Sequence, residues 1–71
     1  MTIAKLRKKN GWSQEVFARK IGVSRQSVVY WELGSSIPNG KNLLKMAKVF
    51  NVPAETIELI GGRSEDDTVR D

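Results

Sequence analysis

The segment SQEVFARKIGVSRQSVVYWELG, residues 13–34, carries the start and stop signals of two short helices. Ser13 and Ser24 each stand directly before a run of helix-forming residues. Serine is a preferred N-cap because its hydroxyl accepts a backbone N–H of the first turn, which otherwise lacks a partner. Gly22 lies between the two runs and can adopt the left-handed conformation that ends a helix. The segment therefore predicts two helices joined by a tight turn, over about residues 14–21 and 25–32.

The two expected helices differ in what they present outward. Trp12 precedes the first cap and is placed to pack on Phe17 as a hydrophobic staple. In the second helix, Val28 and Trp31 are three positions apart and share an inner face. The other sides of that helix carry Arg25, Gln26, Ser27, Val29 and Tyr30. A helix that packs by one edge and offers polar side chains from its first turn is typical of the recognition half of a helix-turn-helix.

The rest of the chain predicts further helices and a tail. Thr2 can cap a helix at the N-terminus, which Gly11 ends. Pro53 suits the start of a last helix, because the N–H that proline lacks is not needed there. These helices are expected over about residues 3–10, 41–50 and 54–60. Residues 62–71 are charged and contain one aliphatic residue, so we expect a disordered acidic tail beyond a domain of residues 1–61.

The charge is unevenly distributed along the 71 residues. The whole chain has a formal net charge of +4, whereas residues 1–60 hold ten Lys/Arg and four Glu, a net charge of +6. A basic body of this size favours a polyanionic partner, most simply nucleic acid.

The composition argues against an enzyme. The chain has no histidine and no cysteine, which excludes nucleophilic dyads with histidine, thiolate metal sites and disulfides. The glutamates of residues 1–60 are scattered, without the spacing of a paired acid and base. We therefore expect no catalytic residue, no metal and no cofactor. No run of about 18 apolar residues is present, so no membrane span is expected.

The pattern also resembles a known family, the helix-turn-helix domains of phage repressors and Cro proteins, which are XRE-like DNA-binding domains. The matching positions are Ser13-Gln14-Glu15, Ala18, Ile21-Gly22-Val23-Ser24, Val28, Trp31-Glu32, Gly34, Pro38, Leu43-Leu44, Met46-Ala47-Lys48 and Phe50-Asn51-Val52. The resemblance covers about residues 3–60 and implies an all-α, compact five-helix, lambda-repressor-like domain with the helix-turn-helix at its second and third helices. It implies a sequence-specific transcriptional regulator, a phage or prophage repressor or Cro-like protein of the bacterial cytoplasm.

Such a regulator reads the major groove of double-stranded operator DNA with its third helix. The resemblance assigns Gln14 to a phosphate contact. It assigns base reading to Arg25, Gln26 and Tyr30, with Val29 beside them. Arginine can bond guanine O6 and N7 and glutamine can bond adenine N6 and N7, although Arg25 can equally contact a phosphate. We expect further DNA contacts from Ser24, Ser27, Ser36, Asn39 and Lys41.

The resemblance also implies a partly buried ion pair between Arg7 of the first helix and Glu32 at the end of the third. Such a pair would tie the recognition helix to the rest of the domain. Its net stabilisation is expected to be small, although deleting one partner of a buried pair costs roughly 3–5 kcal/mol.

Three residues depart from the family pattern and keep other functions open. Val16 stands where the family has a polar, outward residue, Val29 is apolar on the exposed side, and Tyr30 is bulky for a base reader. These side chains can instead belong to a surface that binds a protein. The alternatives are therefore an antirepressor or modulator that binds a partner repressor through the same fold, or an antitoxin.

As a regulator, the protein is expected to bind DNA as a homodimer, with the two recognition helices about 34 Å apart. The apolar residues of the last expected helix, Ile57, Leu59 and Ile60, are the predicted source of dimer contacts.

Overall fold

A computed structural model describes residues 1–60 of the chain. Over this range it contains α1 (Ile3–Lys9), α2 (Gln14–Ile21), α3 (Arg25–Leu33), α4 (Gly40–Phe50) and the short 3-10 helix η1 (Ala54–Thr56). These residues form no β-strand, only an isolated parallel bridge between Thr2 and Glu58. The all-α prediction is therefore confirmed. The predicted tail, residues 62–71, lies outside the described residues.

Both ends of α2 and the start of α3 form where the capping signals predict them, whereas α1 ends at Lys9, one residue earlier than predicted, and α4 begins at Gly40, one residue earlier than predicted. The Ser13 hydroxyl accepts the Val16 N–H at 3.1 Å, and the Ser24 hydroxyl accepts the Ser27 N–H at 3.2 Å. Gly22 has φ +76°, a conformation that L side chains rarely adopt, and it ends α2. Local sequence is sufficient here because every group involved lies within four residues of its partner.

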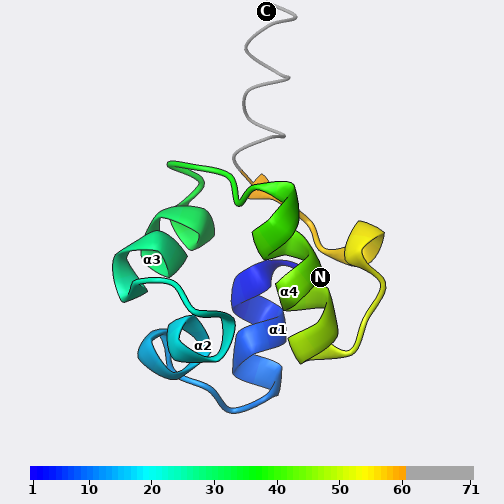
Figure 1. Cartoon of the computed structure of the whole chain (residues 1–71), viewed down its shortest axis with the longest axis horizontal. Coiled ribbons are helices and arrows are strands. Elements are labelled where there is room, and N and C mark those ends of the chain that lie inside the picture. Colours follow the sequence, from blue (N-terminus) through cyan, green and yellow to red (C-terminus); the bar gives the residue numbers. More distant parts are fainter. Residues whose placement is uncertain (61–71) are drawn as a thin grey trace, which may run out of the picture.

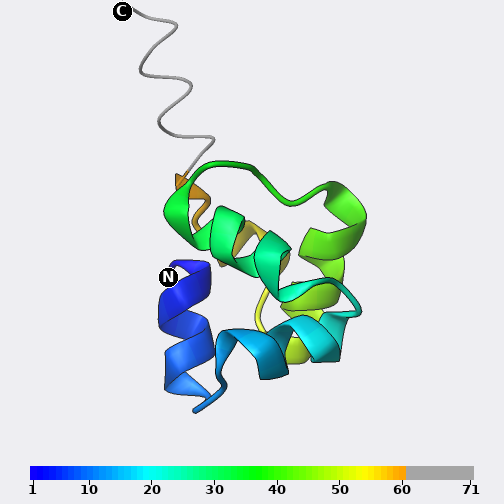
Figure 2. The same ribbon diagram turned by 90° about the vertical axis from the view of Figure 1, so that its left-hand side faces the viewer.

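The four α-helices surround one apolar core. α2 packs against both α3 and α4, α1 contacts α3, and η1 lies against α4. Figure 1 shows α2 and α3 on one side of the molecule, and α1 and α4 on the other. The view in Figure 2, turned by 90°, shows α2 and α3 facing the viewer, with α3 above α2, α1 at the left and α4 at the right. The pair α2 and α3 thus occupies an outer face of the domain.

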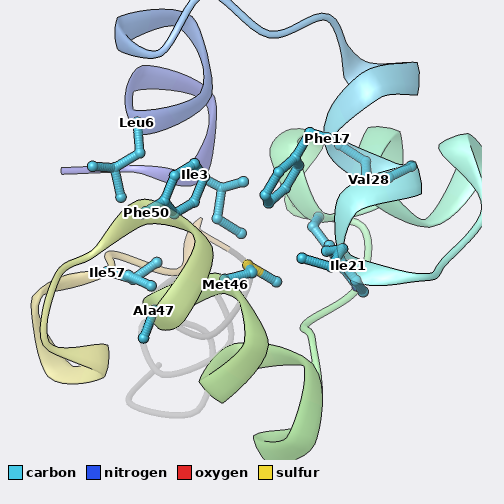
Figure 3. Packing of buried hydrophobic residues seen from close by; sticks show 11 residues of the cluster. Ile3, Leu6, Phe17, Ile21, Val28, Met46, Ala47, Phe50 and Ile57 are labelled. Atoms are coloured by element: carbon cyan, nitrogen blue, oxygen red, sulfur yellow. The ribbon is translucent and has the colours of Figure 1, made fainter.

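The core is centred where α2, α3 and α4 meet. Phe17, Val28 and Met46 are fully buried there, and Figure 3 shows their side chains among those of the other helices. The rings of Trp12 and Phe17 stack with centroids 6.3 Å apart, as the staple predicts. Phe50 of α4 continues the stack at 4.9 Å from Phe17. This packing fixes the position of α2, and through α2 that of α3.

The helix predicted over residues 54–60 is wrong as an α-helix. The chain makes only the 3-10 helix Ala54–Thr56, and Ile57 is extended with φ −85° and ψ 117°. Glu58 then donates its backbone N–H to the carbonyl of Met1 at 3.0 Å. Pairing with the N-terminal segment thus replaces helical bonds at this point. Four α-helices and η1, rather than five α-helices, make up the part that the structure describes.

Candidate nucleic-acid interface

The turn between α2 and α3 holds the two helices in fixed relation. Val23 donates its backbone N–H to the carbonyl of Ala18 at 3.0 Å, which closes the end of α2 around Gly22. Val28 and Trp31 are buried and anchor α3 by one edge. α3 is therefore held by its inner edge, while Arg25 and Gln26 in its first turn remain exposed to solvent.

The first turn of α3 offers polar side chains to solvent. Arg25 and Gln26 are exposed, and neither side chain has a hydrogen bond or ion pair with any group of residues 1–60. Ser27 is half-buried, and its hydroxyl lies 3.2 Å from that of Ser24. Two long side chains with unused donors therefore project from the start of an exposed helix.

A buried polar network lies at the other end of α3. Arg7 Nε donates to Glu32 Oε2 at 2.6 Å, and Arg7 Nη2 donates to Glu32 Oε1 at 3.1 Å. Arg7 Nη1 donates to the carbonyl oxygen of Trp12 at 2.9 Å. The structure therefore places these two residues in the bidentate geometry that an arginine and a carboxylate favour. The contact joins α1 to α3.

The same network includes Gln14, the first residue of α2. Gln14 Nε2 donates to Glu32 Oε1 at 3.0 Å. The family resemblance implies a phosphate contact for Gln14 and an ion pair between Glu32 and Arg7, but it does not indicate the bond between Gln14 and Glu32. The spacing of residues along the sequence does not predict this bond, because the two residues are 18 positions apart and meet only when α3 packs on α2.

The loop before α4 contributes a third group of candidates. The Oδ1 atom of Asn39 accepts the Asn42 N–H at 2.8 Å and caps α4. Its side-chain NH2 is consequently the part of Asn39 that can donate to a ligand. Ser36 and Lys41 are exposed on either side of it.

The candidate protein-binding residues are only partly available. Val16 and Val29 are half-buried, whereas Tyr30 is 44% exposed. Sequence reasoning missed Leu33, the last residue of α3, which is 70% exposed. Its position before Gly34, outside the face of Val28 and Trp31, is the signal that would have indicated exposure. Tyr30 and Leu33 are the large apolar side chains that α3 presents to solvent.

The predicted dimer residues also have different surroundings. Ile57 belongs to the core, Leu59 is half-buried against the core, and Ile60 is exposed. Assigning Ile57 to a dimer surface is therefore wrong, because its side chain is already used within one chain.

Other kinds of site receive little support from the described range. Residues 1–60 contain no group of three or more His, Cys, Asp or Glu side chains placed to hold a metal. A shallow depression of about 560 Å³ lies between α4 and η1, lined by Leu44, Ala47, Lys48, Asn51, Val52, Pro53, Ala54 and Glu55. None of the helices in this range is long and apolar enough to cross a membrane.

The chain belongs to the helix-turn-helix family, whose model matches residues 3–57. An uncharacterized HTH-type transcriptional regulator of Archaeoglobus fulgidus is 38% identical over 55 residues, covering 78% of this chain and 79% of that protein. A similarly named protein of Bacillus subtilis, YgzD, is 34% identical over 55 residues, which cover 78% of this chain and 83% of YgzD. A third HTH-type transcriptional regulator, from Methanocaldococcus jannaschii, is 44% identical over 45 residues, which cover 63% of this chain and 68% of that protein. No solved structure matched the chain.

Proposed function

We propose that this protein is a transcriptional regulator of the phage repressor or Cro kind, which reads operator DNA with α3 in the major groove. The observation that carries the proposal is that Arg25 and Gln26 are exposed and have no partner among residues 1–60. Both side chains are exposed in the first turn of α3, without partners among residues 1–60, on a helix anchored by buried Val28 and Trp31. The names of the relatives, all HTH-type transcriptional regulators, support the same function.

The chemistry of these side chains suits base edges in the major groove. A guanidinium can donate to guanine O6 and N7 together, and a side-chain amide can pair with adenine N6 and N7. We assign these contacts to Arg25 and Gln26. Tyr30, one turn further along α3, and half-buried Val29 are assigned to the edge of the same contact, where a thymine methyl group can be touched.

Contacts to the DNA backbone fix the orientation of such a protein without carrying sequence information. We assign them to Gln14 at the start of α2, to the hydroxyls of Ser24 and Ser27, and to the loop before α4. In that loop the donors are the Ser36 hydroxyl, the Asn39 side-chain NH2 and the Lys41 ammonium. The net charge of +6 on residues 1–60 adds attraction for all phosphates.

A homodimer would place two copies of α3 in successive major grooves, about 34 Å apart. Since Ile57 is in the core, the proposed dimer contacts reduce to Leu59 and Ile60 near the end of the described chain. Sedimentation at micromolar concentration, with and without operator, tests this part. A strict monomer in both conditions contradicts it.

The main experiment is a selection of duplexes from a random pool by the full chain, followed by titration of the selected and a scrambled duplex at two salt concentrations. We expect a defined sequence preference and a fall in affinity with salt, because basic side chains displace counterions from phosphates. Binding without any preference among the pool contradicts the proposal.

One observation favours a second candidate, a module that binds a partner repressor. Tyr30 and Leu33 expose apolar surface on α3, at 44% and 70%, where a groove-reading helix needs polar side chains. Capture of a repressor domain by the full chain, together with no sequence preference on DNA, would favour this function over operator binding.

A further inference from the structure

The carboxylate of Glu32 is shared by side chains from two other helices. Its Oε2 atom accepts from Arg7 Nε, and its Oε1 atom accepts both from Arg7 Nη2 and from Gln14 Nε2. The side chains of Arg7 and Glu32 are only 10% and 9% exposed, so the pair is largely removed from water. The ion pair alone would join α1 to α3. The bond from Gln14 also ties the first residue of α2 to the same carboxylate.

The carboxylate also determines which way the amide of Gln14 points. An ionised carboxylate only accepts hydrogen bonds, so the NH2 of Gln14, rather than its carbonyl, must face Glu32. One N–H of that NH2 is used at 3.0 Å, and the second N–H remains available. Phosphate oxygens are likewise acceptors, so this second N–H is the group of Gln14 suited to a DNA backbone.

We infer that Glu32 is a positioning residue for DNA binding, which holds the Gln14 amide so that its second N–H donates to a phosphate. This inference rests on the proposed function. Glu32 itself touches no DNA in this arrangement and acts through Gln14.

Arg7 of α1 also helps to hold Gln14 in place, through its bonds to Glu32 and to Trp12. Two of its donor groups hold Glu32, and Nη1 holds the carbonyl oxygen of Trp12 at 2.9 Å. Trp12 immediately precedes Ser13, the cap of α2, so the guanidinium also fixes the backbone that leads into Gln14. The amide of Gln14 is thus held both by its side-chain bond and by the position of its main chain.

Gln26 provides an internal contrast. It is exposed, and no group of residues 1–60 binds its side chain. Gln26 must lose rotamer freedom when it meets a base, whereas Gln14 has lost that freedom already during folding. The two glutamines should therefore differ in mobility before any DNA is present.

The first experiment uses NMR relaxation of side-chain amides in the free full chain. We expect the Gln14 NH2 to show a heteronuclear NOE close to that of the helix backbone, and the Gln26 NH2 to show a much lower one. Equal, low values for both glutamines would overturn the inference. This measurement needs no variant and therefore does not depend on whether a changed network still folds.

The second experiment is a double-mutant cycle in DNA affinity, using Gln14→Ala, Glu32→Gln and the double variant on the selected duplex. Glu15→Gln is the matched control, because it removes the same charge from a side chain that is 73% exposed in the first turn of α2. We expect Glu32→Gln to weaken binding roughly two- to ten-fold relative to this control. In the Gln14→Ala background the same change should add nothing, and an equal further loss would overturn the inference.

The outcomes separate this inference from the proposed function. If the wild-type chain binds no duplex, the proposed function fails and the positioning role fails with it. If the wild-type chain binds with sequence preference but the cycle is additive or the Gln14 amide is mobile, only the role of Glu32 fails.

Discussion

α2 and α3 both begin with a serine cap followed by polar side chains, yet the two helix starts differ in their tertiary surroundings. At the start of α2, Gln14 is hydrogen-bonded to the buried carboxylate of Glu32. At the start of α3, Arg25 and Gln26 are exposed and unpartnered within residues 1–60. The difference teaches that one local motif can occur twice with different surroundings, once with a side chain held by a tertiary hydrogen bond and once with side chains exposed to solvent.

The largest effect, on the free energy of unfolding, is expected from removing the Glu32 carboxylate that holds Gln14 at the start of α2. Glu32→Ala leaves the guanidinium of Arg7 buried without its partner, which should lower the free energy of unfolding by about 3–5 kcal/mol. Urea unfolding measures this loss. Glu15→Ala, at an exposed position, is the control and should change stability by less than about 0.5 kcal/mol. A cycle of Arg7→Met and Glu32→Met with purely additive effects would mean that the pair contributes no coupling.

The next largest effect, on DNA affinity, is expected from Gln26→Ala in the exposed first turn of α3. Removing a bidentate base contact should cost about 1–3 kcal/mol on the selected duplex and flatten the preference at one base pair. Titration of selected and scrambled duplexes measures both effects. Equal losses on the two duplexes would show that Gln26 does not read a base.

Arg25→Ala distinguishes two roles for the neighbouring side chain. If Arg25 reads a base, the loss should again be about 1–3 kcal/mol and specific to one base pair. If it contacts only phosphate, all duplexes should weaken alike and the salt slope should fall by about one. Titrations at several salt concentrations decide between them, and no change in either quantity would remove Arg25 from the interface.

Smaller effects should follow from the caps that the two helices share. Ser13→Ala and Ser24→Ala should each lower the free energy of unfolding by about 1 kcal/mol, because each removes the acceptor for one first-turn N–H. Replacing the same serines by glycine should cost only a few tenths of a kcal/mol, roughly. Thermal or urea unfolding of the four variants checks the ranking, and equal costs for alanine and glycine would contradict it.

The smallest expected effect on binding is that of Gln14→Ala. The hydrogen bond from the Gln14 amide to a solvent-exposed phosphate is expected to contribute about 0.5–1.5 kcal/mol, and its loss should weaken selected and scrambled duplexes alike. The ratio of the two affinities is the quantity to measure. A change in that ratio would show that the start of α2 also reads sequence, and the contrast with α3 would disappear.

The candidate site was partly predictable from sequence. The positions of Arg25 and Gln26 on an outer helix face follow from the cap at Ser24 and the inner pair Val28 and Trp31. The half-burial of Val16 and Val29 did not follow, because the exposure of a side chain at the margin of a helix face depends on what packs beside it. The exposure of Leu33, in contrast, could have been predicted, because this residue lies outside the face of Val28 and Trp31 and directly before Gly34.

Sequence alone determined the elements whose partners lie within a few residues. The caps Ser13 and Ser24, the left-handed Gly22 and the boundaries of α2 and α3 all belong to this group. Their hydrogen bonds form between groups three to five positions apart, so the residue types present are enough to specify them.

Only the tertiary structure decided the contacts that span long stretches of chain. Gln14 reaches Glu32 across 18 positions, and Arg7 reaches it across 25. The segment after Pro53 leaves the helical path because Glu58 meets Met1 at the opposite end of the described chain. In each case the choice of partner depends on where packed helices bring polar groups together, and local propensity carries no information about that placement.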